Sequence, residues 1–594
     1  MVFTTARLRD RFEQVQQLRQ SGQGAMADMV TREILAAPAA SADDYHCQAI
    51  LFMDLGRFTE ARARFDLAMS RGAPTPELLV DRAVALIEGR RLADAIASCE
   101  AALKLNPEFA PAHLVHGDCL RDSGHPALAL ERYAKALDCA RDFVPALRNR
   151  ADLHTQTGNL EAALEDLTRL AKLLPNDPVI HNARGQVLGA LERYEEALRS
   201  LDKAASLNPR NPGIHHNRGV TLWNMERHAE AIAAYDQALA LSPNPVTLSN
   251  KANTLQELLR LDEAMAAHDR AVAMQPDHPS SHWNRAQGKL LQGRWRDGLE
   301  EFEWRKRRPE GRAEFLNVPQ PEWRGDSDVS GKTLLIRSEL ALGDTLHFVR
   351  YAALAQERGA RVILAVQKPL VPLLQAHLVP PVDQVIAKDD PLPAFDLHTS
   401  TMSLPFAFRT EVETAPARVP YLKADEARMA QWRERLGRDG FRIGVSWRGA
   451  GGMHDRGRSY PLKLLAGLAA LPGVRLISLQ KGDGLDQLED LPKGMKVETL
   501  GEDFDSGGAF LDTIAVMESL DLVISSDTSI AHLAGALARP VWMATKFAPE
   551  WRWLLNREDS VWYPTMRLFR QDKPGDWTGV FAAMEKALAE KLNP

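Results

Sequence analysis

The sequence predicts an all-α solenoid of repeated helix pairs followed by an α/β module with two parallel sheets. One observation is a period of about 34 residues in the amino-terminal half. The other is an alternation of short apolar strands with amphipathic helices, which begins at residue 332 and begins again near residue 438. At 594 residues the chain is also too long for one hydrophobic core. We therefore expect a helical cap, the solenoid, a connection and two α/β domains, at residues 1–42, 43–305, 306–331, 332–437 and 438–594.

The composition excludes several functional classes. The net charge is −6 and the pI is near 6.3, so we expect neither a nucleic-acid partner nor a basic membrane-binding patch. No run of 18 apolar residues occurs and no apolar stretch follows Met1, which predicts neither a membrane span nor a signal peptide. The four cysteines, Cys47, Cys99, Cys119 and Cys139, lack CxxC spacing. They predict neither disulfides nor zinc, and the simplest location for the protein is the cytoplasm.

The period is marked by a small residue at the start of the second helix of each pair. Successive markers are 33 or 34 residues apart: Ala61, Ala95, Ala129, Ala163, Ala197, Ala231, Ala264 and Gly298. Prolines recur at the same interval, and aromatic residues such as Phe65 and Tyr133 follow the markers by one turn. This combination is the tetratricopeptide signature and predicts eight helix pairs. A single pair cannot bury its own apolar face, so the pairs stack into a solenoid with a concave binding surface.

The first helices of four pairs carry an asparagine fourteen residues before the marker. These residues are Asn149, Asn217, Asn250 and Asn284, and Ala183 interrupts the series. A side-chain amide both donates and accepts hydrogen bonds, so a regular series of amides suits the backbone of an extended peptide. We predict an acceptor-protein groove at the four asparagines. The alternative is that polar residues only line a solvated groove wall.

Both α/β domains contain strands that alternate with helices, as a parallel sheet requires. The strands predicted in the first domain are 332–337, 361–366, 382–387 and a fourth that begins at Leu397. The strands predicted in the second domain are 442–447, 475–480 and 522–525, with helices at 424–436, 461–471 and 512–520. Two such domains in tandem enclose a cleft, and ligands bind in clefts of this kind.

Gly343 and Asp344 directly follow the first predicted strand, in the loop that leads into a helix. A carboxylate at the carboxyl end of this strand points into the cleft. It suits a general base that takes the proton from an attacking hydroxyl. The alternative is an aspartate that caps the helix starting near Thr345.

A loop rich in glycine and arginine, WRGAGGMHDRGRS, occupies residues 447–459. Its glycines let the backbone approach a ligand closely. It offers four candidate donors for phosphate oxygens: Arg448, His454, Arg456 and Arg458. The alternative is a solvated loop. The next predicted strand ends at Gln480 and Lys481, which adds an amide and a cation at the mouth of the cleft.

The stretch DLVISSDTSIAHLAGAL, residues 521–537, reads as a buried strand followed by a helix. Asp527, Thr528 and Ser529 stand at the junction, and His532 lies in the first turn of the helix. A helix start directs unpaired backbone N–H groups and the positive end of the helix dipole at one point, which suits a phosphate. The alternative is that these side chains only cap the helix. No GxGxxG motif occurs, so the prediction of donor binding does not depend on common nucleotide motifs.

Residues 551–571, WRWLLNREDSVWYPTMRLFRQ, are rich in aromatic residues and arginines. Stacking of a base or sugar on tryptophan and pairing of phosphate with arginine are the functional interpretations. The alternative is that the segment packs back across its own domain. We favour this packing interpretation for Trp553 and Trp562.

Five sequence blocks resemble those of the bacterial tetratricopeptide glycosyltransferases, including the enzymes that modify flagellin. The blocks are GDTLHFVRYA, GVSWRG with HDRGRSYPL, SLQKG, DLVISSDTSIAHLAGALARPVW and WRWLLNREDSVWYPTMRLFRQ. Residues 332–594 are more distantly similar to the lipopolysaccharide heptosyltransferases. The asparagine series resembles that of the O-linked N-acetylglucosamine transferases. These resemblances imply the GT-B fold with two Rossmann-like domains, and neither a required metal nor a cofactor beyond the nucleotide-sugar co-substrate.

The resemblance also implies roles for single residues. In heptosyltransferases the aspartate of the Gly-Asp loop is the proposed base, which implies this role for Asp344. Their helix start binds the phosphates of the donor, which carries over to Asp527, Thr528 and Ser529, with serine in place of a glycine. A basic residue that contacts the donor carries over to Arg458.

We therefore predict a protein O-glycosyltransferase that moves a sugar from a nucleotide donor to a Ser or Thr of a protein captured by the solenoid. The resemblance favours flagellin as acceptor and a CMP-activated nonulosonic acid, such as pseudaminic acid, as donor. UDP-N-acetylglucosamine is the alternative donor. An alternative of another class is a non-catalytic tetratricopeptide adaptor or secretion chaperone for flagellin. A lipopolysaccharide transferase is a third alternative, although such an enzyme would not need the repeats.

Overall fold

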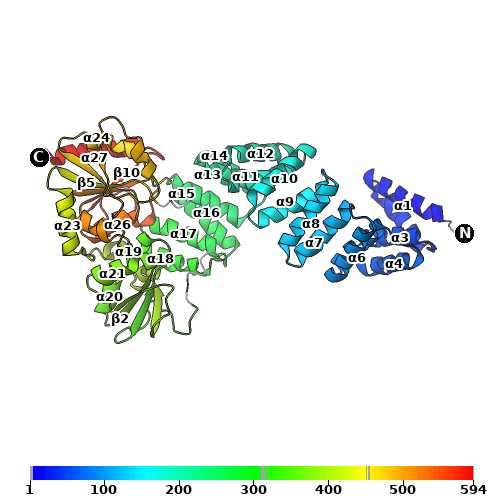
Figure 1. The fold of residues 1–594 in the computed structure, drawn as a ribbon, viewed down its shortest axis with the longest axis horizontal. Helices are drawn as coiled ribbons and strands as arrows, with labels where there is room; N and C mark the ends of the chain where they lie inside the picture. Colours follow the sequence, from blue (N-terminus) through cyan, green and yellow to red (C-terminus); the bar gives the residue numbers. More distant parts are fainter. Residues whose placement is uncertain are drawn as a thin grey trace. The chain divides into compact units, whose positions relative to one another are not determined.

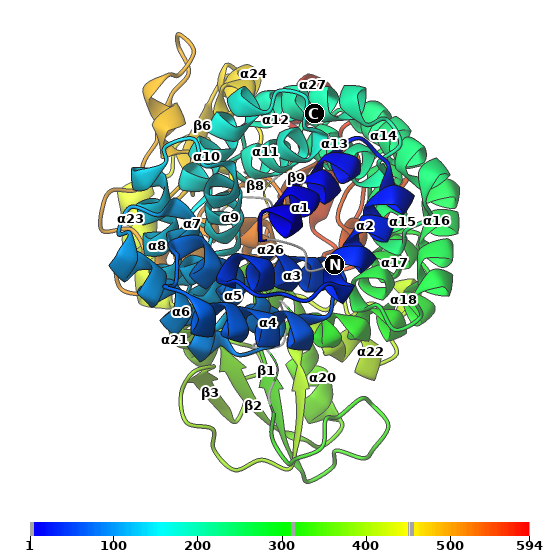
Figure 2. The same ribbon diagram turned by 90° about the vertical axis from the view of Figure 1, so that its right-hand side faces the viewer.

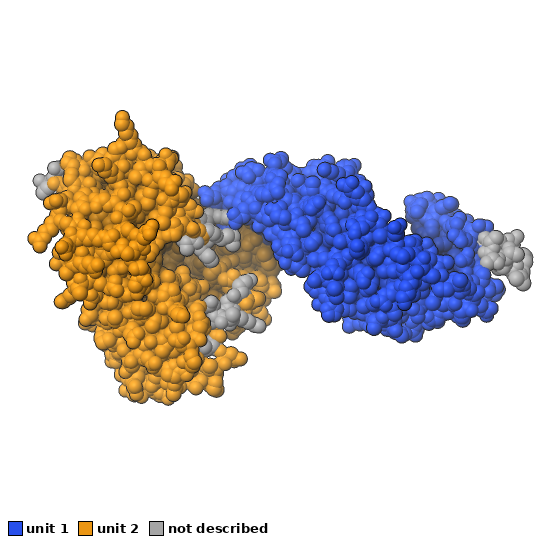
Figure 3. Space-filling view, viewed as in Figure 1, with its two compact units in different colours: residues 1–230 blue, residues 231–594 orange. Residues whose placement is uncertain are grey.

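The computed structural model describes residues 5–309, 315, 317–449, 451, 455 and 457–592. The chain divides into two compact units, residues 1–230 and 231–594, which are blue and orange in Figure 3. The division falls within α14 (His228–Leu241), one of the repeat helices.

The first unit is all-α, and its helices follow one another through short turns (Figure 1). Before α14 the helices are α1 (Thr5–Gln20), α2 (Gly24–Ala36), α3 (Ala42–Asp54), α4 (Phe58–Arg71), α5 (Pro76–Glu88), α6 (Leu92–Leu105), α7 (Ala110–Asp122), α8 (Pro126–Cys139), α9 (Val144–Gln156), α10 (Leu160–Leu173), α11 (Pro178–Ala190), α12 (Tyr194–Leu207) and α13 (Pro212–Asn224). A turn that contains Gly22, at φ +75°, separates α1 from α2. From α3 to α13 the helices alternate between 13 and 14 residues, which maintains the period seen in the sequence.

The small marker residues are buried where the two helices of a pair approach closely. The markers of the first unit all have 0% exposure: Ala61, Ala95, Ala129, Ala163 and Ala197. The close approach is visible at Gly117, where an added Cβ would lie 2.5 Å from the ring of Tyr133. A larger side chain at such a position would clash with the facing helix.

A recurring hydrogen bond involves the periodic prolines. A histidine near the start of a first helix places Nε2 close to the carbonyl oxygen of a proline six residues earlier. The pairs are His113 with Pro107 (2.9 Å), His181 with Pro175 (2.9 Å), His215 with Pro209 (2.8 Å) and, in the second unit, His282 with Pro276 (2.7 Å). The imidazole thus satisfies a backbone carbonyl in the turn between successive pairs.

The second unit begins with the last repeat helices and continues into two parallel sheets. Its remaining repeat helices are α15 (Pro245–Glu257), α16 (Leu261–Met274), α17 (Pro279–Leu291) and α18 (Trp295–Phe302), followed by a 3₁₀ turn at Glu303–Arg307. Helices α3 to α18 therefore form the eight predicted pairs, within residues 42–302, all of which the structure describes.

The first sheet has four strands in the order β3-β2-β1-β4. These are β1 (Thr333–Arg337), β2 (Arg361–Val366), β3 (Gln384–Ala387) and β4 (Leu397–Ser400). The helices of this part are α19 (Leu342–Phe348), α20 (Tyr351–Glu357), α21 (Val371–His377) and α22 (Leu404–Ala407). Strands β1, β2 and β3 lie side by side in Figure 2.

The second sheet has six strands in the order β10-β9-β8-β5-β6-β7. These are β5 (Phe441–Ser446), β6 (Val474–Ser478), β7 (Val497–Glu498), β8 (Leu522–Ser525), β9 (Val541–Thr545) and β10 (Met566–Arg570). The helices are α23 (Glu426–Leu436), α24 (Ala466–Ala469), α25 (Leu511–Met517), α26 (Ser529–Ala536) and α27 (Trp577–Leu592). The helix predicted at 461–471 is instead a 3₁₀ turn, Leu462–Leu465, followed by the short α24, so that prediction is only partly correct.

Each sheet reverses its winding direction once. In the first sheet β2 and β3 lie on one side of β1, and β4 lies on the other. In the second sheet β6 and β7 lie on one side of β5, and β8 lies on the other. All strand pairs within both sheets are parallel. In open α/β sheets, ligands bind outside the carboxyl ends of the strands at such reversal points.

The last repeat helices share one hydrophobic core with both sheets. This core includes Trp295 of α18, Leu334 of β1 and Val523 of β8. The second sheet buries its other face, including Ile524, against α24 and α27. The boundary expected at 305 separates repeats from sheets along the sequence, whereas the compact unit that contains the sheets also contains α15 to α18.

Two polar contacts fasten these repeat helices to the sheets. Lys546 Nζ lies 3.0 Å from a carboxylate oxygen of Glu257 at the end of α15. Arg305, buried after α18, donates to Glu339 at 2.6 Å and to the hydroxyl of Ser403 at 2.8 Å. None of the helices in the described residues combines the length and apolar character needed to cross a bilayer.

Candidate functional site

Two helix starts, one from each sheet, lie against each other. Helix α19 follows β1, and helix α26 follows β8 after Ser526, Asp527 and Thr528. A Cβ added to Gly343 would lie 3.3 Å from Cδ2 of His532 and 3.7 Å from the backbone nitrogen of Ser529. The absence of a side chain at Gly343 therefore lets the first turn of α19 approach the first turn of α26.

The Asp344 carboxylate makes two polar contacts, one within its own helix start and one with Arg552. Its Oδ2 accepts a hydrogen bond from the backbone nitrogen of Ala341 at 3.1 Å, as a helix-capping carboxylate does. Its Oδ1 accepts from Nη2 of Arg552 at 2.5 Å. The capping bond fixes the position of the carboxylate, and the arginine gives it an ionic partner from the other sheet's loop.

Arg552 bridges two carboxylates. Its Nη1 lies 3.0 Å from Oε1 of Glu550, and its backbone nitrogen donates to Oε2 of the same residue at 2.9 Å. The guanidinium packs over the ring of Phe348, with Cζ 4.8 Å from the ring centroid. Burial raises the pKa of Glu550 to about 7, with Asp527 and Asp344 adding to the rise and Arg552 opposing it. The site therefore holds an acid that titrates near neutral pH.

The start of α26 presents backbone N–H groups without a side-chain cap. Thr528 is the N-cap residue, and its side chain makes no capping hydrogen bond within the described residues. Instead, its hydroxyl lies 3.1 Å from that of Ser525. Among the described residues, the buried hydroxyl of Ser526 and the buried Nε of Arg458 also lack hydrogen-bond partners. Unpaired donors at a helix start are the groups that an anionic ligand would satisfy.

The glycine- and arginine-rich loop lies beside this helix start. A Cβ on Gly449 would lie 3.8 Å from Cγ2 of Thr528. Arg458 Nη1 is 4.0 Å from Oδ2 of Asp527. Arg448 is half-buried, and no hydrogen bond or ion pair of its guanidinium occurs within the described part of the chain. The predicted donors His454 and Arg456 lie outside the described residues.

The structure gives two predicted donor-binding side chains other partners. Gln480 Oε1 accepts from the backbone nitrogens of Trp447 and Arg448, at 3.0 and 3.1 Å, and its Nε2 donates to the Arg448 carbonyl at 2.8 Å. Lys481 Nζ donates to the carbonyl oxygen of Phe504 at 2.6 Å. Gln480 thus braces the turn after β5, and the Lys481 ammonium is directed at another loop, so neither side chain presents a free donor at the start of α26.

His532 belongs to a buried polar network. Its Nδ1 lies 3.0 Å from the hydroxyl of Tyr563 and 3.3 Å from Nδ1 of His347. Burial, together with the positive charges of Arg552 and Arg350, holds the pKa of His532 well below its ordinary value. The pKa of His347 is lowered in the same way. Both imidazoles are therefore neutral at pH 7, and His532 positions α26 against α19 rather than supplying a cation.

The aromatic segment that follows β9 packs mainly into the core. Trp553 and Trp562 are 1% and 0% exposed, in agreement with the packing interpretation. Trp562 stacks on Trp295, with ring centroids 5.1 Å apart. Glu550 and Arg552, which contact the site, were not identified from the sequence. The signal available was that Arg552 lies in a segment rich in arginine and that Glu550 directly precedes that segment.

The four asparagines of the predicted groove are half-buried. In the first unit Asn149 donates to Asp118 at 2.7 Å, and Asn217 donates to Asn182 at 2.9 Å. In the second unit Asn250 and Asn284 lie on α15 and α17. The amides of the first unit thus take part in polar contacts between neighbouring first helices.

Comparison with known proteins supports the repeat assignment. Residues 48–108, 114–178 and 182–244 match the tetratricopeptide repeat. The helix pairs are tetratricopeptide repeats. Solved repeat structures similar to this chain include the carboxyl-terminal part of a protein from Cytophaga hutchinsonii (17% identity, 40% of this chain and 98% of that one, TM-score 0.35). Another is a tetratricopeptide protein from Parabacteroides merdae (17% identity, 41% of this chain and 97% of that one, TM-score 0.32).

The chain is also similar to one curated protein over part of its length. Protein FlbA of Caulobacter vibrioides is 28% identical over 327 residues, which is 52% of this chain and 54% of FlbA. The chain thus spans about half the length of this curated relative. Within the described residues, no three or more His, Cys, Asp or Glu side chains are grouped as a metal site would require.

Proposed function

We propose that the chain is a protein O-glycosyltransferase of the GT-B type, in which the tetratricopeptide repeats capture an acceptor protein. The sheets would bind a nucleotide-sugar and transfer its sugar to a Ser or Thr hydroxyl. The observation that carries this proposal is the meeting of two helix starts, those of α19 and α26, which leave their sheets beside the two reversal points. One helix start supplies a carboxylate, Asp344, and the other supplies uncapped backbone N–H groups.

The start of α26 suits the phosphate of the donor. The uncapped N–H groups after Thr528, the unpaired Ser526 hydroxyl and the Arg458 guanidinium are all donors. As the bond between sugar and phosphate breaks, negative charge develops on the leaving oxygen. Donors already fixed in place stabilise that charge more in the transition state than in the bound substrate. In this proposal Asp527 holds Arg458 in place rather than contacting the phosphate itself.

Asp344 would accept the proton of the attacking hydroxyl. Its ion pair with Arg552 orients the carboxylate. Glu550 shares the same guanidinium. Once Asp344 is protonated, Arg552 retains a carboxylate partner, so the positive charge does not become unpaired. The shared arginine thus permits proton uptake at Asp344 within a buried site.

The preferred donor is a CMP-activated nonulosonic acid such as pseudaminic acid, and the preferred acceptor is flagellin. Both preferences derive from the resemblance of the sequence blocks to the flagellin-modifying enzymes. The alternative donor is UDP-N-acetylglucosamine. A CMP-linked sugar carries one phosphate and a UDP-linked sugar carries two. The hydrogen-bond donors around the start of α26 suit either group.

Intact mass spectrometry of flagellin tests the proposal. Purified full-length chain is incubated with flagellin and with each candidate donor, and the mass increment identifies the sugar transferred. We expect a mass increment with the wild type. Asp344→Ala removes the proposed base and Thr528→Pro distorts the start of α26, so each should lower the rate of transfer by at least about 100-fold. Asp503→Ala, an exposed aspartate paired with Arg435, is the matched control and should leave the rate unchanged.

Two outcomes contradict the proposal in different ways. Unaltered transfer by the Asp344 and Thr528 variants would show that the reaction occurs at another site. Stable binding of flagellin without a mass increment from any donor would instead indicate the non-catalytic adaptor.

A further inference from the structure

The repeats carry a regular series of cations, one of which differs from the others. The residue after the asparagine position is basic in six first helices: Arg82, Arg150, Arg184, Arg218, Lys251 and Arg285. Five of these cations pair with a carboxylate on a second helix. The pairs are Arg82 with Asp66, Arg150 with Asp166, Arg218 with Asp202, Lys251 with Asp236, and Arg285 with Asp269 and Glu301.

Within the described part of the chain, Arg184 is paired with hydroxyl groups and with no carboxylate. Its Nε donates to Oγ1 of Thr168 at 3.2 Å, and its Nη1 donates to Oγ of Ser200 at 2.7 Å. Among the described residues, no carboxylate lies within ion-pair distance of this half-buried guanidinium. Ser200 occupies the position that Asp166 occupies beside Arg150, sixteen residues after the cation. In this repeat the chain therefore omits the anion that it supplies elsewhere.

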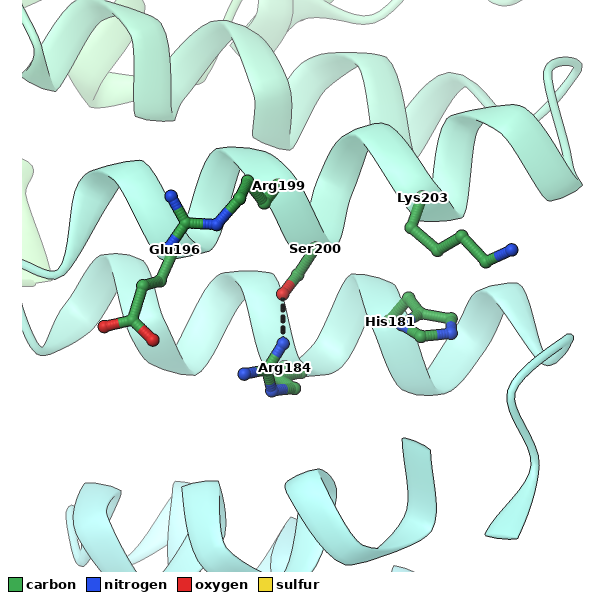
Figure 4. A pocket seen from close by; sticks show the side chains of 6 residues that line it. All are labelled: His181, Arg184, Glu196, Arg199, Ser200 and Lys203. Atoms are coloured by element: carbon green, nitrogen blue, oxygen red, sulfur yellow. Dashed lines mark hydrogen bonds between the residues drawn. The ribbon is translucent and has the colours of Figure 1, made fainter. Parts of the chain in front are cut away.

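The omission coincides with a pocket. A cavity of about 210 Å³ is lined by residues of α11 and α12. Figure 4 shows its lining side chains and the hydrogen bond between Arg184 and Ser200. Its lining residues are His181, Arg184, Glu196, Arg199, Ser200 and Lys203. The only carboxylate, Glu196, already accepts a hydrogen bond from Arg193 at 2.7 Å. Arg199 and Lys203 are exposed, and in Figure 4 Arg199 extends toward Glu196 while Lys203 extends in the opposite direction. The pocket is therefore lined by three cations and one carboxylate.

We propose that this pocket binds an acidic side chain from a segment of the acceptor protein. A carboxylate is favoured over other anions because all five related cations pair with carboxylates. Two of them, Arg150 and Arg285, do so at the place of Ser200, sixteen residues after the cation. An incoming Asp or Glu would pair with Arg184, while Arg199 and Lys203 would attract acidic neighbours. The inference rests on the proposed role of the repeats in acceptor capture, and it names the chemistry that the acceptor must present.

Ser200→Asp provides the sharpest test because it supplies the missing anion from within the chain. Arg150 and Asp166 show that the fold accommodates this pair with the aspartate buried. The probe is a fluorescein-labelled octaglutamate peptide, with octaglutamine as the neutral comparison, and binding to the full chain is followed by anisotropy. We expect octaglutamate to bind the wild type at least about tenfold more tightly than octaglutamine, and Ser200→Asp to abolish this difference.

Matched variants distinguish the pocket from general charge effects. Ser206→Asp adds the same charge to the exposed surface of the same helix and should change the affinity by less than about twofold. Arg184→Gln should lower the affinity as Ser200→Asp does, whereas Arg218→Gln in the next repeat should not. Equal affinity for octaglutamate in the wild type and in Ser200→Asp would overturn the proposal. Displacement of the peptide by inorganic phosphate, but not by chloride at the same ionic strength, would overturn it in favour of a phosphate site.

The same variant separates this inference from the proposed function. If transfer occurs, Ser200→Asp should raise KM for the acceptor protein and leave kcat and the donor KM unchanged. A rise in the donor KM would contradict a role in acceptor binding. If no donor supports transfer, the proposed function fails, but the peptide experiment still decides whether the pocket binds carboxylates.

Discussion

Arg552 is the residue on which the site's charges depend. It lies in the loop after β9 and bridges Asp344 after β1 with Glu550 beside it. These residues are buried or half-buried, so the two negative charges and the one positive charge lack full hydration. Removing one member of a buried charge cluster leaves another uncompensated, which costs more than the cluster contributed.

Arg552→Met should destabilise the second unit by about 3–5 kcal/mol because Asp344 and Glu550 lose their shared cation. Urea unfolding followed by tryptophan fluorescence measures this loss, since every tryptophan except Trp223 lies in residues 231–594. The control is Arg567→Met, which removes a 46% exposed side chain paired with Glu558. We expect a change below about 1 kcal/mol in the control. Similar losses in both variants would contradict the role given to Arg552.

Glu550 should make stability depend on pH in an unusual direction. Its pKa is raised to about 7, so the folded protein keeps a proton that the unfolded chain releases above its ordinary pKa near 4.5. Between these values the folded state binds more protons, and the free energy of unfolding therefore falls as pH rises from about 4.5 to 7. Glu550→Gln should remove this contribution and raise the melting temperature at pH 8. Parallel pH profiles for the wild type and Glu550→Gln would refute the assignment.

Helix α26 is positioned by contacts along its whole length. Its first turn faces Gly343, and its later turns are buried against the aromatic core. Gly535, near the end of the helix, illustrates how close that packing is. A Cβ at this position would lie 2.4 Å from Cδ1 of Tyr563, whose hydroxyl contacts His532. The position of the helix start therefore depends on a glycine two turns away.

Gly535→Ala should destabilise the second unit by about 1–3 kcal/mol because the added methyl group displaces the Tyr563 ring. The same substitution usually stabilises a helix by up to about 1 kcal/mol. Gly189→Ala in α11 is the control, since an added Cβ there meets no atom within 4 Å. Circular-dichroism melts should show opposite shifts for the two variants. A stabilising Gly535→Ala would disprove the close packing against Tyr563.

The sequence predicted the strands and helices of the site better than the side-chain contacts between them. Strands β2 and β8 match their predicted limits, and Gly343 lies against the start of α26, as two facing α/β domains imply. The contact between Arg552 and Asp344 joins residues 208 positions apart, and no local pattern encodes such a pairing. The contacts of Gln480 were not predicted for a related reason: its amide bonds the turn after β5, and only the folded backbone shows this.

Some strands were also missed. Strand β10, MRLFR, lies in the aromatic and basic stretch 551–571, for which ligand contact and packing were both considered. Strand β9, VWMAT, is buried throughout and follows Pro540 directly, and no strand was predicted there. Both strands lie within sequence blocks that were interpreted in terms of function, and neither was predicted as a strand. The predicted second domain therefore lacked β9 and β10.

At the level of the complete chain, the division between repeats and sheets differs from the sequence boundary. Helices α15 to α18 belong to the compact unit of residues 231–594. Trp295 is 1% exposed and lies 5.6 Å from Trp551 and 5.1 Å from Trp562, measured between ring centroids. The final repeats therefore complete the hydrophobic core of the sheets.

Two truncations should separate these roles. A chain that begins at His228, the first residue of α14, should fold and retain donor binding because the second unit keeps its core. A chain that begins after Arg305 loses Trp295 and the ion pair with Glu339. We expect its melting temperature to fall by at least about 10 °C relative to the first truncation. Differential scanning calorimetry makes the comparison, and equal melting temperatures would show that the last repeats are dispensable for the sheets.

The shared core around Trp295 also limits how such proteins can exchange parts. A recombination event at residue 305 would join a foreign solenoid to sheets that lack their tryptophan partner and their buried arginine. An event in the turn before α15 would carry the last two helix pairs along with the sheets and preserve these contacts. The shared core therefore makes the pair of sheets together with two repeats the unit that can be exchanged intact. Under the proposed function, new acceptor specificities would then arise by replacing the repeats that precede this unit.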